Sequence, residues 1–575
     1  MPKIGFYIDR VMRVAPAAIL LAGLPLAAQS SAPLSCAVLS VPTQVRAEGL
    51  TELIGDIVLS CTGGAPTPVG RTIPQGNIAV YLNTNVTSRI FSNGGSEALL
   101  LIDEPLPPST TSPPPNPQTA CASITGCLVP GNGGAGEVFN GSDAAHPNVF
   151  QGVVSGNSVT FQGVPIEAPA GGGTRTYRIT NVRANASAVP SSTGISTNIM
   201  ASVSASGSTA LPLSNPVRIV GAVQSGLSFA AGAVTTSQCA QLSDATQSAA
   251  LVYSEGFPSA FRPRTSANPD PNGGQRTPGV DYYSESGLVV PELSNAGLAD
   301  FGTRFKAVFR NIPAGVTAVW VATSNVGATT NMAQMTLSES GPFYPVASTN
   351  TIQGIPTVQL PVANGTATAV WEVTAASPLV QETFFFPVFF DSSTGLDPNA
   401  PTATVNGSFA PTASAFPSGD GGQAQPASFP IPRFIDTSTA TTIILVLPCQ
   451  TLLLFPMVTN QGGFDTGLAI SNTSSDPIGT AAQAGTCTLN AYGANAPAPL
   501  VTPSIAAGSS YTMLASTVFP NFNGYIFALC NFQYAHGFAF ISDIGARNLA
   551  MGYLALVVGQ GLPRTGAPSG ESAVN

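Results

Sequence analysis

Charged residues are scarce in this sequence of 575 residues, because Asp, Glu, Lys and Arg together make up only 8% of it, against about 25% in ordinary soluble domains. The chain has two lysines, Lys3 and Lys306, and a formal net charge of −9. Proteins that bind nucleic acid neutralise its phosphates with clustered basic side chains. The composition therefore excludes nucleic acid as a partner and predicts a surface made mostly of Ser, Thr, Asn, Gln and Gly.

Histidine is equally scarce, since His146 and His536 are its two occurrences. A Ser-His-Asp triad needs a histidine as its base, and the sequence has no Gly-x-Ser-x-Gly motif around a nucleophile. It also lacks the Cys-x-x-Cys pairs and neighbouring histidines of structural metal sites. We therefore expect no catalytic residue of this type, no metal ligand and no cofactor, and the sequence favours a non-enzymatic role.

Alternation of apolar and polar residues with a period of two recurs along the chain, and helical periodicity is rare. Between Ile199 and Ser208 serines alternate with apolar residues, while Ala98 to Ile102 is a continuous apolar run, typical of a strand covered on both faces. Short strands separated by Gly, Pro and Asn turns indicate an all-β fold. We expect tandem β-sandwich modules, immunoglobulin-like or jelly-roll-like, with proline- and glycine-rich loops.

The first residues have the features of a secretory signal peptide. Lys3, Arg10 and Arg13 precede an apolar run from Val14 to Leu26, and small residues follow. The run is shorter than the roughly 20 residues that span a bilayer, and no second run of that length follows. We therefore expect residues 1–31 to be removed as a signal peptide. The mature protein is then exported without a transmembrane helix, to the extracellular space or the cell surface, with the outer surface and the periplasm both open.

An even number of cysteines fits an exported chain that forms disulfide bonds. The eight disulfide candidates are Cys36, Cys61, Cys121, Cys127, Cys239, Cys449, Cys487 and Cys530. Eight cysteines allow 105 pairings, among which the sequence does not choose. Pairing in chain order is the simplest interpretation, and it joins Cys36 to Cys61, Cys121 to Cys127, Cys239 to Cys449, and Cys487 to Cys530.

Shifts in composition divide the chain after the signal peptide into five parts. The proline-dense stretch from Pro105 to Pro117 interrupts the first of them, and no fixed repeat period supports a solenoid or propeller. The expected parts are an N-terminal β module at 32–223, a β-sandwich module at 224–345, a β-sandwich module at 346–447 ending in a linker rich in Pro, Gly and Ser, a C-terminal β-sandwich module at 448–559, and a disordered tail at 560–575.

Two short motifs match ligand sites but lack their context. Gly131 to Gly136 satisfies G-x-G-x-x-G without the strand and helix that hold a dinucleotide, so we expect a loop. Asn268 to Gly273 matches the first half of a calcium loop, but Gly279 stands where a bidentate carboxylate is needed. A surface turn is favoured there, and calcium binding through Asp281 stays open.

Glycoside hydrolysis needs two carboxylates about 5–10 Å apart. Nothing in the sequence brings two acids together, so a glycosidase is neither placed nor excluded; the candidates are Glu48, Glu52, Asp56, Asp103, Glu104 and Glu372. Aromatic clusters at Phe384–Phe386 and Phe389–Phe390 suit stacking on sugar rings, but aromatic residues that alternate into a core are far more common.

His536 lies in a run with aromatic residues at every second position, namely Phe532, Tyr534, Phe538 and Phe540. On an uninterrupted strand these side chains share one face, which predicts an aromatic core row containing a buried, neutral histidine. The alternative is a bulge or tight turn at Gly537, which would split the run and reverse the facing after it.

Two segments resemble known proteins. The segment Arg46–Glu52, continuing through Gly55–Leu59 to Cys61–Gly64, resembles the start of exported proteins of soil bacteria. The segment Gly463–Asn472, continuing to Cys530–Phe538, is similar to them as well. The family in question consists of uncharacterised exported β-rich multi-module proteins. The resemblance implies export and a β-rich fold of several modules, and it implies no activity or catalytic residue.

These features predict a secreted or cell-surface protein of β-sandwich modules that acts non-enzymatically, in structure or adhesion. Its expected partners are a surface glycan, a matrix component or a protein ligand. The alternative is a carbohydrate-active enzyme or a carbohydrate-binding protein, with a carboxylate pair or an aromatic platform on one of the sandwiches.

Overall fold

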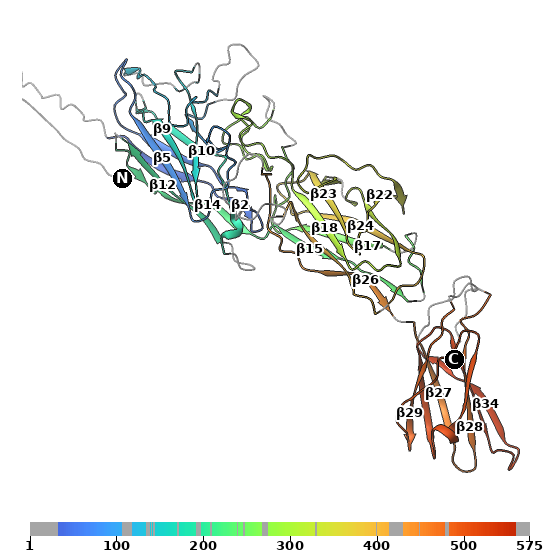
Figure 1. Ribbon diagram of the computed structural model, residues 1–575. Coiled ribbons are helices and arrows are strands. Elements are labelled where there is room, and N and C mark those ends of the chain that lie inside the picture. The colour runs from blue at the N-terminus through green and yellow to red at the C-terminus, as the bar shows by residue number, and fades with distance from the viewer. Residues whose placement is uncertain are drawn as a thin grey trace, which may run out of the picture.

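The chain, for which we describe a computed structural model, is built almost entirely from β-strands (Figure 1). Their sheets pack in pairs around hydrophobic cores and form three β-sandwiches in succession. The predicted all-β class and tandem sandwich architecture are therefore confirmed. The structure describes residues 33–105, 118–133, 139, 141, 144–169, 172–190, 197–207, 210–238, 240–244, 248–266, 274–327, 330–397, 399–412, 429–447, 449–477 and 482–558.

Several predicted segments lie outside the described residues. These are the signal peptide, the C-terminal tail at 560–575, the calcium half-loop at 268–273, and most of the linker before residue 429. Among the helices that the structure does describe, none has the length and apolarity that crossing a membrane requires.

The first sandwich stacks two six-stranded sheets. The first sheet contains, in order, β13 (Leu213–Ser214), β1 (Ser35–Ser40), β4 (Ile57–Thr62), β10 (Arg175–Thr180), β6 (Leu99–Ile102) and β7 (Val149–Gln151). The second contains β2 (Thr43–Arg46), β14 (Val217–Gln224), β12 (Thr197–Gly207), β5 (Gln75–Leu82), β9 (Ser158–Pro165) and β8 (Val153–Ser155). A two-stranded sheet and a 3-10 turn complete it: β3 (Glu52–Leu53), β11 (Arg183–Ala184) and η3 (Ala186–Ala188).

Strand β12 follows the alternation that the sequence predicts. Ile199, Ala201 and Val203 are buried in the core between the two sheets, while Ser202 and Ser204 are exposed. Successive side chains of a strand point to opposite faces, so the serines cover the outside and the aliphatic residues fill the inside. The prediction for this segment is confirmed.

The second sandwich also stacks two six-stranded sheets. One contains β15 (Leu227–Ala231), β17 (Ser248–Glu255), β24 (Thr383–Ser392), β19 (Val316–Ala322), β22 (Ile355–Gln359) and β21 (Asn350–Ile352). The other contains β16 (Val234–Ser237), β26 (Thr441–Leu447), β25 (Ala403–Ala410), β18 (Arg304–Arg310), β23 (Ala367–Ala375) and β20 (Met332–Met335). The 3-10 turn η4 (Pro291–Leu293) precedes β18.

The expected boundary between modules at 345 and 346 falls inside this second sandwich and is a correction. Strand β18 pairs with β23 on one side and with β25 on the other, and β17 pairs with β24. Phe305, Trp371 and Phe384 consequently share one core. Neither half buries both of its sheets alone, because strands far apart in the sequence are neighbours in the sheets.

The phenylalanine clusters belong to the core of the same sandwich. Phe384, Phe386 and Phe390 are buried in this core, whereas Phe385 and Phe389 lie on the other side of β24, where Phe385 is exposed and Phe389 is covered. The ring of Phe386 stacks on that of Trp371, with centroids 4.3 Å apart. The expectation of alternating core aromatics is confirmed for Phe384, Phe386 and Phe390.

The third sandwich stacks a five-stranded sheet on a four-stranded one. The five-stranded sheet contains β30 (Leu500–Val501), β29 (Cys487–Ala494), β32 (Asn523–Cys530), β27 (Thr451–Thr459) and β35 (Leu556–Val558). The four-stranded sheet contains β31 (Ser510–Leu514), β28 (Asp465–Asn472), β33 (Ala535–Ser542) and β34 (Ala550–Leu554). A single helical turn, α1 (Ala515–Val518), follows β31.

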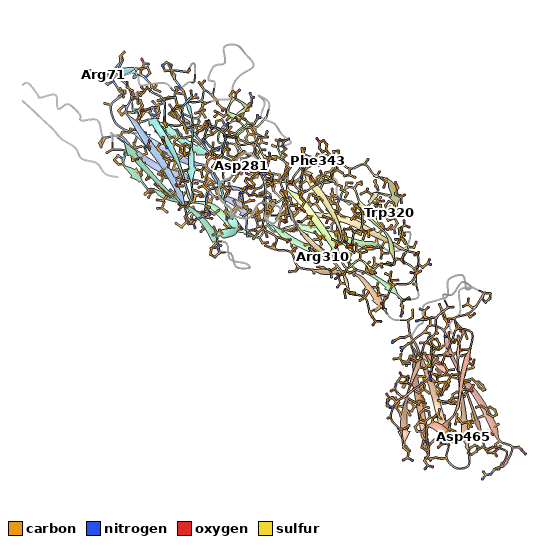
Figure 2. The ribbon with its side chains drawn as sticks, in the orientation of Figure 1. Arg71, Asp281, Arg310, Trp320, Phe343 and Asp465 are labelled. Carbon is orange, nitrogen blue, oxygen red and sulfur yellow. A yellow bond between two sulfur atoms is a disulfide. The ribbon has the colours of Figure 1, made fainter. Side chains whose placement is uncertain are left out.

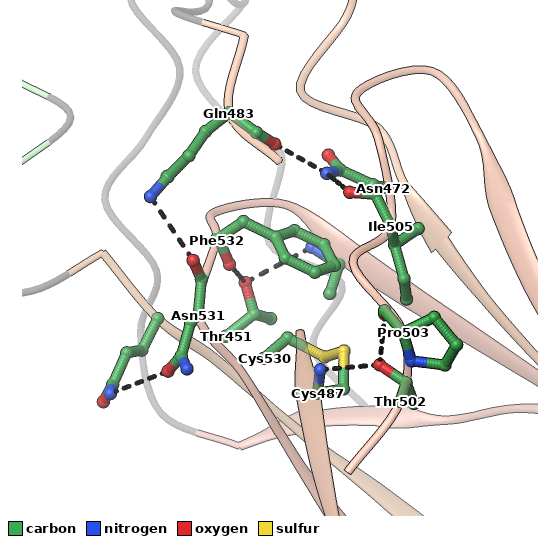
Figure 3. Close-up of a disulfide and its surroundings, with 12 residues drawn as sticks. Thr451, Asn472, Gln483, Cys487, Thr502, Pro503, Ile505, Cys530, Asn531 and Phe532 are labelled. Carbon is green, nitrogen blue, oxygen red and sulfur yellow. Dashed lines mark hydrogen bonds between the residues drawn. A yellow bond between two sulfur atoms is a disulfide. The ribbon is translucent and has the colours of Figure 1, made fainter. Parts of the chain in front are cut away.

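Three disulfide bonds join cysteines that follow one another in the chain. Cys36–Cys61 links β1 to β4, Cys121–Cys127 closes a short loop, and Cys487–Cys530 links β29 to β32 (Figure 3). Beside the last bridge, the backbone N–H of Cys487 donates to the Thr502 hydroxyl at 2.9 Å. Cys449 is also disulfide-bonded, while Cys239, its expected partner in chain order, lies outside the described residues.

Removal of the bridge in the third sandwich should cost stability. We expect the double substitution Cys487→Ala, Cys530→Ala to lower the free energy of unfolding of this sandwich by about 2–4 kcal/mol, because the bridge spans 43 residues and restricts the unfolded chain. Calorimetry on the full chain measures the effect. The matched control is Cys121→Ala, Cys127→Ala, which opens a span of 6 residues and should cost less. Equal losses would contradict the loop-length argument.

Candidate functional site

Arg46, the last residue of β2, is fully buried where the first sandwich meets the second. Its Nη1 and Nη2 donate to the two carboxylate oxygens of Glu285 at 2.7 and 3.0 Å, and its Nε donates to Glu52 at 2.8 Å. Nη1 also donates to the hydroxyl of Thr303 at 3.0 Å. Glu285 and Thr303 belong to the segment that leads into β18. The guanidinium of the first sandwich is therefore bonded to the second.

The charges in this cluster stabilise one another. Burial by itself lowers the pKa of the Arg46 guanidinium, but Glu285 and Glu52 raise it above its ordinary value. Burial likewise raises the pKa of Glu285, but Arg46 brings it below its ordinary value. The ring of Phe434 packs against the guanidinium, 4.7 Å from its central carbon. Arg46 and Glu285 are therefore both charged, and the attraction between them offsets the free energy that each loses by leaving water.

Further hydrogen bonds cross the same junction. The Asn181 side chain donates to the carbonyl of Leu288 at 2.7 Å and accepts from its N–H at 2.9 Å. Nη2 of Arg183 donates to the backbone carbonyl of Glu285 at 2.9 Å. Both groups of contacts are buried, so they hold the segment before β18 against the first sandwich.

An apolar contact reinforces this junction at strand β6. All four residues of β6 are buried, and Leu99 and Leu101, on its outer side, pack against Leu288, Val290 and Ala296. The segment around η4 thus covers the outside of a sheet whose inside already faces a core. The prediction that Ala98 to Ile102 forms a strand covered on both faces is confirmed.

Loss of the Arg46 guanidinium should destabilise the protein strongly. Arg46→Met leaves the carboxylates of Glu285 and Glu52 buried without their main partner, and we expect the free energy of unfolding to fall by about 3–5 kcal/mol. Urea unfolding measures this change. The matched control is Arg310→Met, at an exposed residue at the end of β18 (Figure 2), which should change stability by less than about 0.5 kcal/mol. Similar effects of the two substitutions would contradict this view of the junction.

A cavity of about 990 Å³ lies at the same junction. Its walls come from residues 39–44, 53–56 and 58 of the first sandwich and from residues 279–284 and 286–288 of the segment before β18. Figure 2 places Asp281 in this region. The volume is within the range of pockets that hold small ligands.

Two of the predicted carboxylates meet on one arginine, Arg178, which lines this cavity. Nη1 of Arg178 donates to Asp56 at 2.9 Å, and Nη2 donates to Glu104. Asp56 and Arg178 line the cavity, whereas Glu104 is not among the lining residues. Burial raises the pKa of the Asp56 carboxyl, against the opposing effect of Arg178. Asp56 and Arg178 can hydrogen-bond to polar groups of a ligand. The Arg178 guanidinium pairs with both Asp56 and Glu104 and so reduces the repulsion between the two carboxylates.

The structure places the other four predicted carboxylates apart from one another or in structural roles. Glu52 belongs to the Arg46 cluster described above. Glu48 accepts hydrogen bonds from Ser225 and from the backbone of Gly226, Asp103 pairs with Arg175, and Glu372 pairs with Arg304. These acids hold loops and strands in place, and the structure does not bring them into one cleft.

Tyr283 supplies an aromatic surface in the cavity wall. It is 43% exposed, and its backbone has a φ of 49°, which is rare for a bulky residue. The carboxylate of Asp281 accepts a hydrogen bond from the Tyr283 N–H at 2.9 Å and supports this turn. A ring, a carboxylate and an arginine in one cavity suit a ligand with both polar groups and a flat apolar side.

The remaining predicted motifs do not form a ligand site in the part of the chain that the structure describes. No group of three or more His, Cys, Asp or Glu among these residues is placed to hold a metal ion. Gly131 and Gly133 lie in a loop whose backbone bonds to Thr67, and the rest of that glycine run lies outside the described residues. His146 is half-buried in a turn.

Glu255, the last residue of β17, is a buried acid with a pKa raised to about 7 by burial. Its carboxylate accepts from the backbone N–H groups of Phe261 at 2.7 Å and Glu382 at 3.0 Å, which opposes the shift. The folded protein therefore keeps this proton at pH values where the unfolded chain has released it. The resulting stability is complete below about pH 4.5 and is lost as the pH rises through 7.

Glu255 should therefore make the protein less stable as the pH rises. We expect its contribution to the free energy of unfolding to fall by roughly 1–3 kcal/mol between pH 5 and pH 8. Urea unfolding at four pH values, on the unmodified protein and on Glu255→Gln, isolates this contribution as the difference between the two slopes. Parallel curves would show that Glu255 does not titrate in this range.

Strand β33 carries an aromatic surface that faces solvent, which corrects the expected aromatic core row. Phe538 and Phe540 are 43% and 45% exposed, and His536 is half-buried on the same side. The buried side of the strand consists of Ala535, Gly537, Ala539 and Ile541. A side chain at position 537 would come within 2.6 Å of the Phe455 ring, so the core side has no room for a ring at this position and the large rings point outward.

Small residues of the neighbouring strands form the floor on which these rings lie. Phe540 stands between Gly467 of β28 and Gly552 of β34, and Phe538 stands between Ala469 and Leu554. An added side chain at Gly552 would lie 2.7 Å from the Phe538 ring. We call this surface the aromatic face; its residues are Gly467, Ala469, Leu514, Phe538, Phe540, Gly552 and Leu554. The hydroxyls of Ser471 on β28 and Ser510 on β31 are hydrogen-bonded at 2.7 Å farther along these strands.

Comparison of the sequence with protein-family models and with curated proteins finds no match. Among solved structures, the T6 backbone pilin of serotype M6 Streptococcus pyogenes aligns over 90% of this chain and 80% of its own, at 8% identity and a TM-score of 0.19. An enterococcal surface protein, in its partial N-terminal region, aligns over 76% of this chain and 98% of its own, at 8% identity and a TM-score of 0.16. At these TM-scores the likeness supports no argument about function.

Proposed function

We propose that the protein is an exported, secreted or cell-surface component that acts non-enzymatically in structure or adhesion, with the aromatic face of the third sandwich as its contact surface. The observation that supports this proposal is the pair of exposed rings, Phe538 and Phe540, held in register over glycine and alanine. Exposed aromatic side chains that do not fill a core are typical of surfaces that bind a partner.

The chemistry of the aromatic face favours a glycan as the ligand. Phenyl rings over Gly467 and Gly552 offer flat apolar area of the kind that covers one side of a sugar ring. The hydroxyls of Ser471 and Ser510 at the rim can exchange hydrogen bonds with sugar hydroxyls. No charged residue belongs to the face, so it suits a neutral polymer.

The cavity between the first two sandwiches is a second candidate for carbohydrate binding. Tyr283, Asp56 and Arg178 in its wall combine a ring with polar groups. In this alternative the glycan is bound in the cavity, and the aromatic face has no part in it.

Substitution of the two rings should abolish retention on polysaccharide. We expect the mature protein to bind at least one member of a panel of insoluble polysaccharides, including cellulose and chitin, and Phe538→Ser, Phe540→Ser to reduce the bound fraction at least roughly tenfold, because each ring contributes on the order of 1 kcal/mol. Pull-down with the soluble fraction quantified by absorbance measures the loss.

Two further variants serve as controls. Tyr344→Ser removes an aromatic residue that is 59% exposed elsewhere in the chain and should bind like the unmodified protein. Tyr283→Ser tests the cavity. Loss of binding in Tyr283→Ser alone would assign glycan binding to the cavity instead of the aromatic face. Absence of retention on every polysaccharide in the panel would contradict the glycan proposal.

A further inference from the structure

Strands β29 and β32 of the third sandwich lie side by side and pair in antiparallel register along their whole length. At one end of this strand pair, the disulfide bond described above joins Cys487 to Cys530 (Figure 3). Toward the other end, Tyr492 lies directly opposite Tyr525. The same two strands therefore have a covalent bond at one end and a pair of tyrosines in matching register at the other.

Both tyrosine side chains point outward from the sandwich. Tyr492 is 47% exposed and Tyr525 is 41% exposed, whereas Ile526 and Ala528, which alternate with the outward residues of β32, are fully buried. The centroids of the two tyrosine rings are 5.3 Å apart and their planes are inclined by 16°, so the rings are stacked. The two phenols therefore lie next to each other on the solvent side of the sheet.

A third ring restricts the orientation of this pair. Phe527 lies on the same side of β32, and its ring centroid is 6.1 Å from that of Tyr492 and 6.0 Å from that of Tyr525. Its plane is inclined to theirs by 82° and 87°, which is the edge-to-face geometry that aromatic rings favour. The two phenol rings are consequently held parallel by their own sheet.

The hydroxyls of Tyr492 and Tyr525 face water. No group among the described residues forms a hydrogen bond with either of them, whereas the buried hydroxyl of Tyr253 donates to the carbonyl of Lys306 at 2.9 Å. A buried tyrosine hydroxyl usually has a protein partner, and an exposed one is accessible to reagents in solution. Both phenols can therefore be reached by an oxidant.

Two phenols in this arrangement are suited to oxidative coupling. A phenol that loses a hydrogen atom becomes a radical whose unpaired electron is shared between the oxygen and the neighbouring ring carbons, and two such radicals combine through these carbons. Holding the two rings side by side makes their coupling much faster than that of tyrosines on separate molecules. The disulfide bonds of the chain are themselves typical of proteins in oxidising surroundings.

We propose that Tyr492 and Tyr525 are a site of oxidative cross-linking, at which a dityrosine bond forms between β29 and β32. The oxidant is hydrogen peroxide, used by a haem peroxidase. One hydrogen atom is removed from each phenol O–H, and these two hydrogen atoms reduce one hydrogen peroxide to two water molecules. A Cε carbon of one ring then bonds to a Cε carbon of the other, and the proton that each of these carbons loses is replaced by one on its phenol oxygen. The two residues together lose two hydrogen atoms.

The new bond differs from the disulfide in its response to reductants. A thiol reductant opens Cys487–Cys530, but it does not break a carbon–carbon bond. The cross-linked strands stay joined under reducing conditions, and the cross-link restricts the unfolded chain as a disulfide does. The proposal is independent of the glycan proposal, because Tyr492 and Tyr525 belong to the five-stranded sheet and the aromatic face belongs to the four-stranded one.

Treatment of the mature, disulfide-bonded chain with hydrogen peroxide and a haem peroxidase tests the proposal. We expect dityrosine fluorescence in a chain that migrates as a monomer on a denaturing gel and whose intact mass is lower by two hydrogen atoms. Tyr492→Phe and Tyr525→Phe each keep the ring and remove one phenol. Each should reduce the dityrosine fluorescence of the monomer roughly tenfold or more, because the remaining tyrosine lacks its held partner. Circular dichroism checks that both variants are folded.

The matched control is Tyr344→Phe, at a tyrosine that is 59% exposed and has no aromatic neighbour among the described residues. It should leave the fluorescence of the monomer unchanged. Fluorescence of the monomer that survives both Tyr492→Phe and Tyr525→Phe would overturn the proposal. Dityrosine found in covalent dimers alone, or no dityrosine after treatment, would overturn it as well. Polysaccharide retention is measured separately, so either proposal can fail without the other.

Discussion

The guanidinium of Arg46 is bonded on one side to Glu52 of its own sandwich and on the other to Glu285 of the next. A buried charge without a partner costs several kcal/mol, so the first and second sandwiches cannot separate or slide without losing these bonds. The positions of Leu288 against strand β6 and of the cavity walls depend on the same contact. In a chain with so few charged residues, this cluster ties the first sandwich to the second.

The third sandwich follows the opposite physical strategy. Its five-stranded sheet carries no charged residue, and its four-stranded sheet exposes the large apolar side chains of the aromatic face. Buried polar groups hold the first two sandwiches together, and the third carries two exposed rings in register on one of its sheets. Under the proposed function, the third sandwich is the part of the chain that contacts a partner.

Local patterns predicted local structure well. The alternation in β12, the doubly covered β6 and the core rings of Phe384 and Phe386 all follow from residues that are close in sequence. The module boundary at 345 was wrong because β18 pairs with β23 and β25, and a change in composition between them carries no information about which strands become neighbours. The candidate carboxylates were likewise identified from the sequence. The arginines and other groups that bind them were not, because they are distant in the chain.

The sequence by itself determined the all-β class, because alternating short apolar segments between turns fit no helical fold. Only the tertiary structure decided what lies on the outside. The period of two indicates that Phe538 and Phe540 lie on the same side of the strand as His536. Which side faces the core depends on Phe455 of another strand, because its ring leaves no room for a side chain at Gly537. The pairing of Arg46 with Glu285, 239 residues away, is decided in the same way, because burial brings together charges that the chain separates.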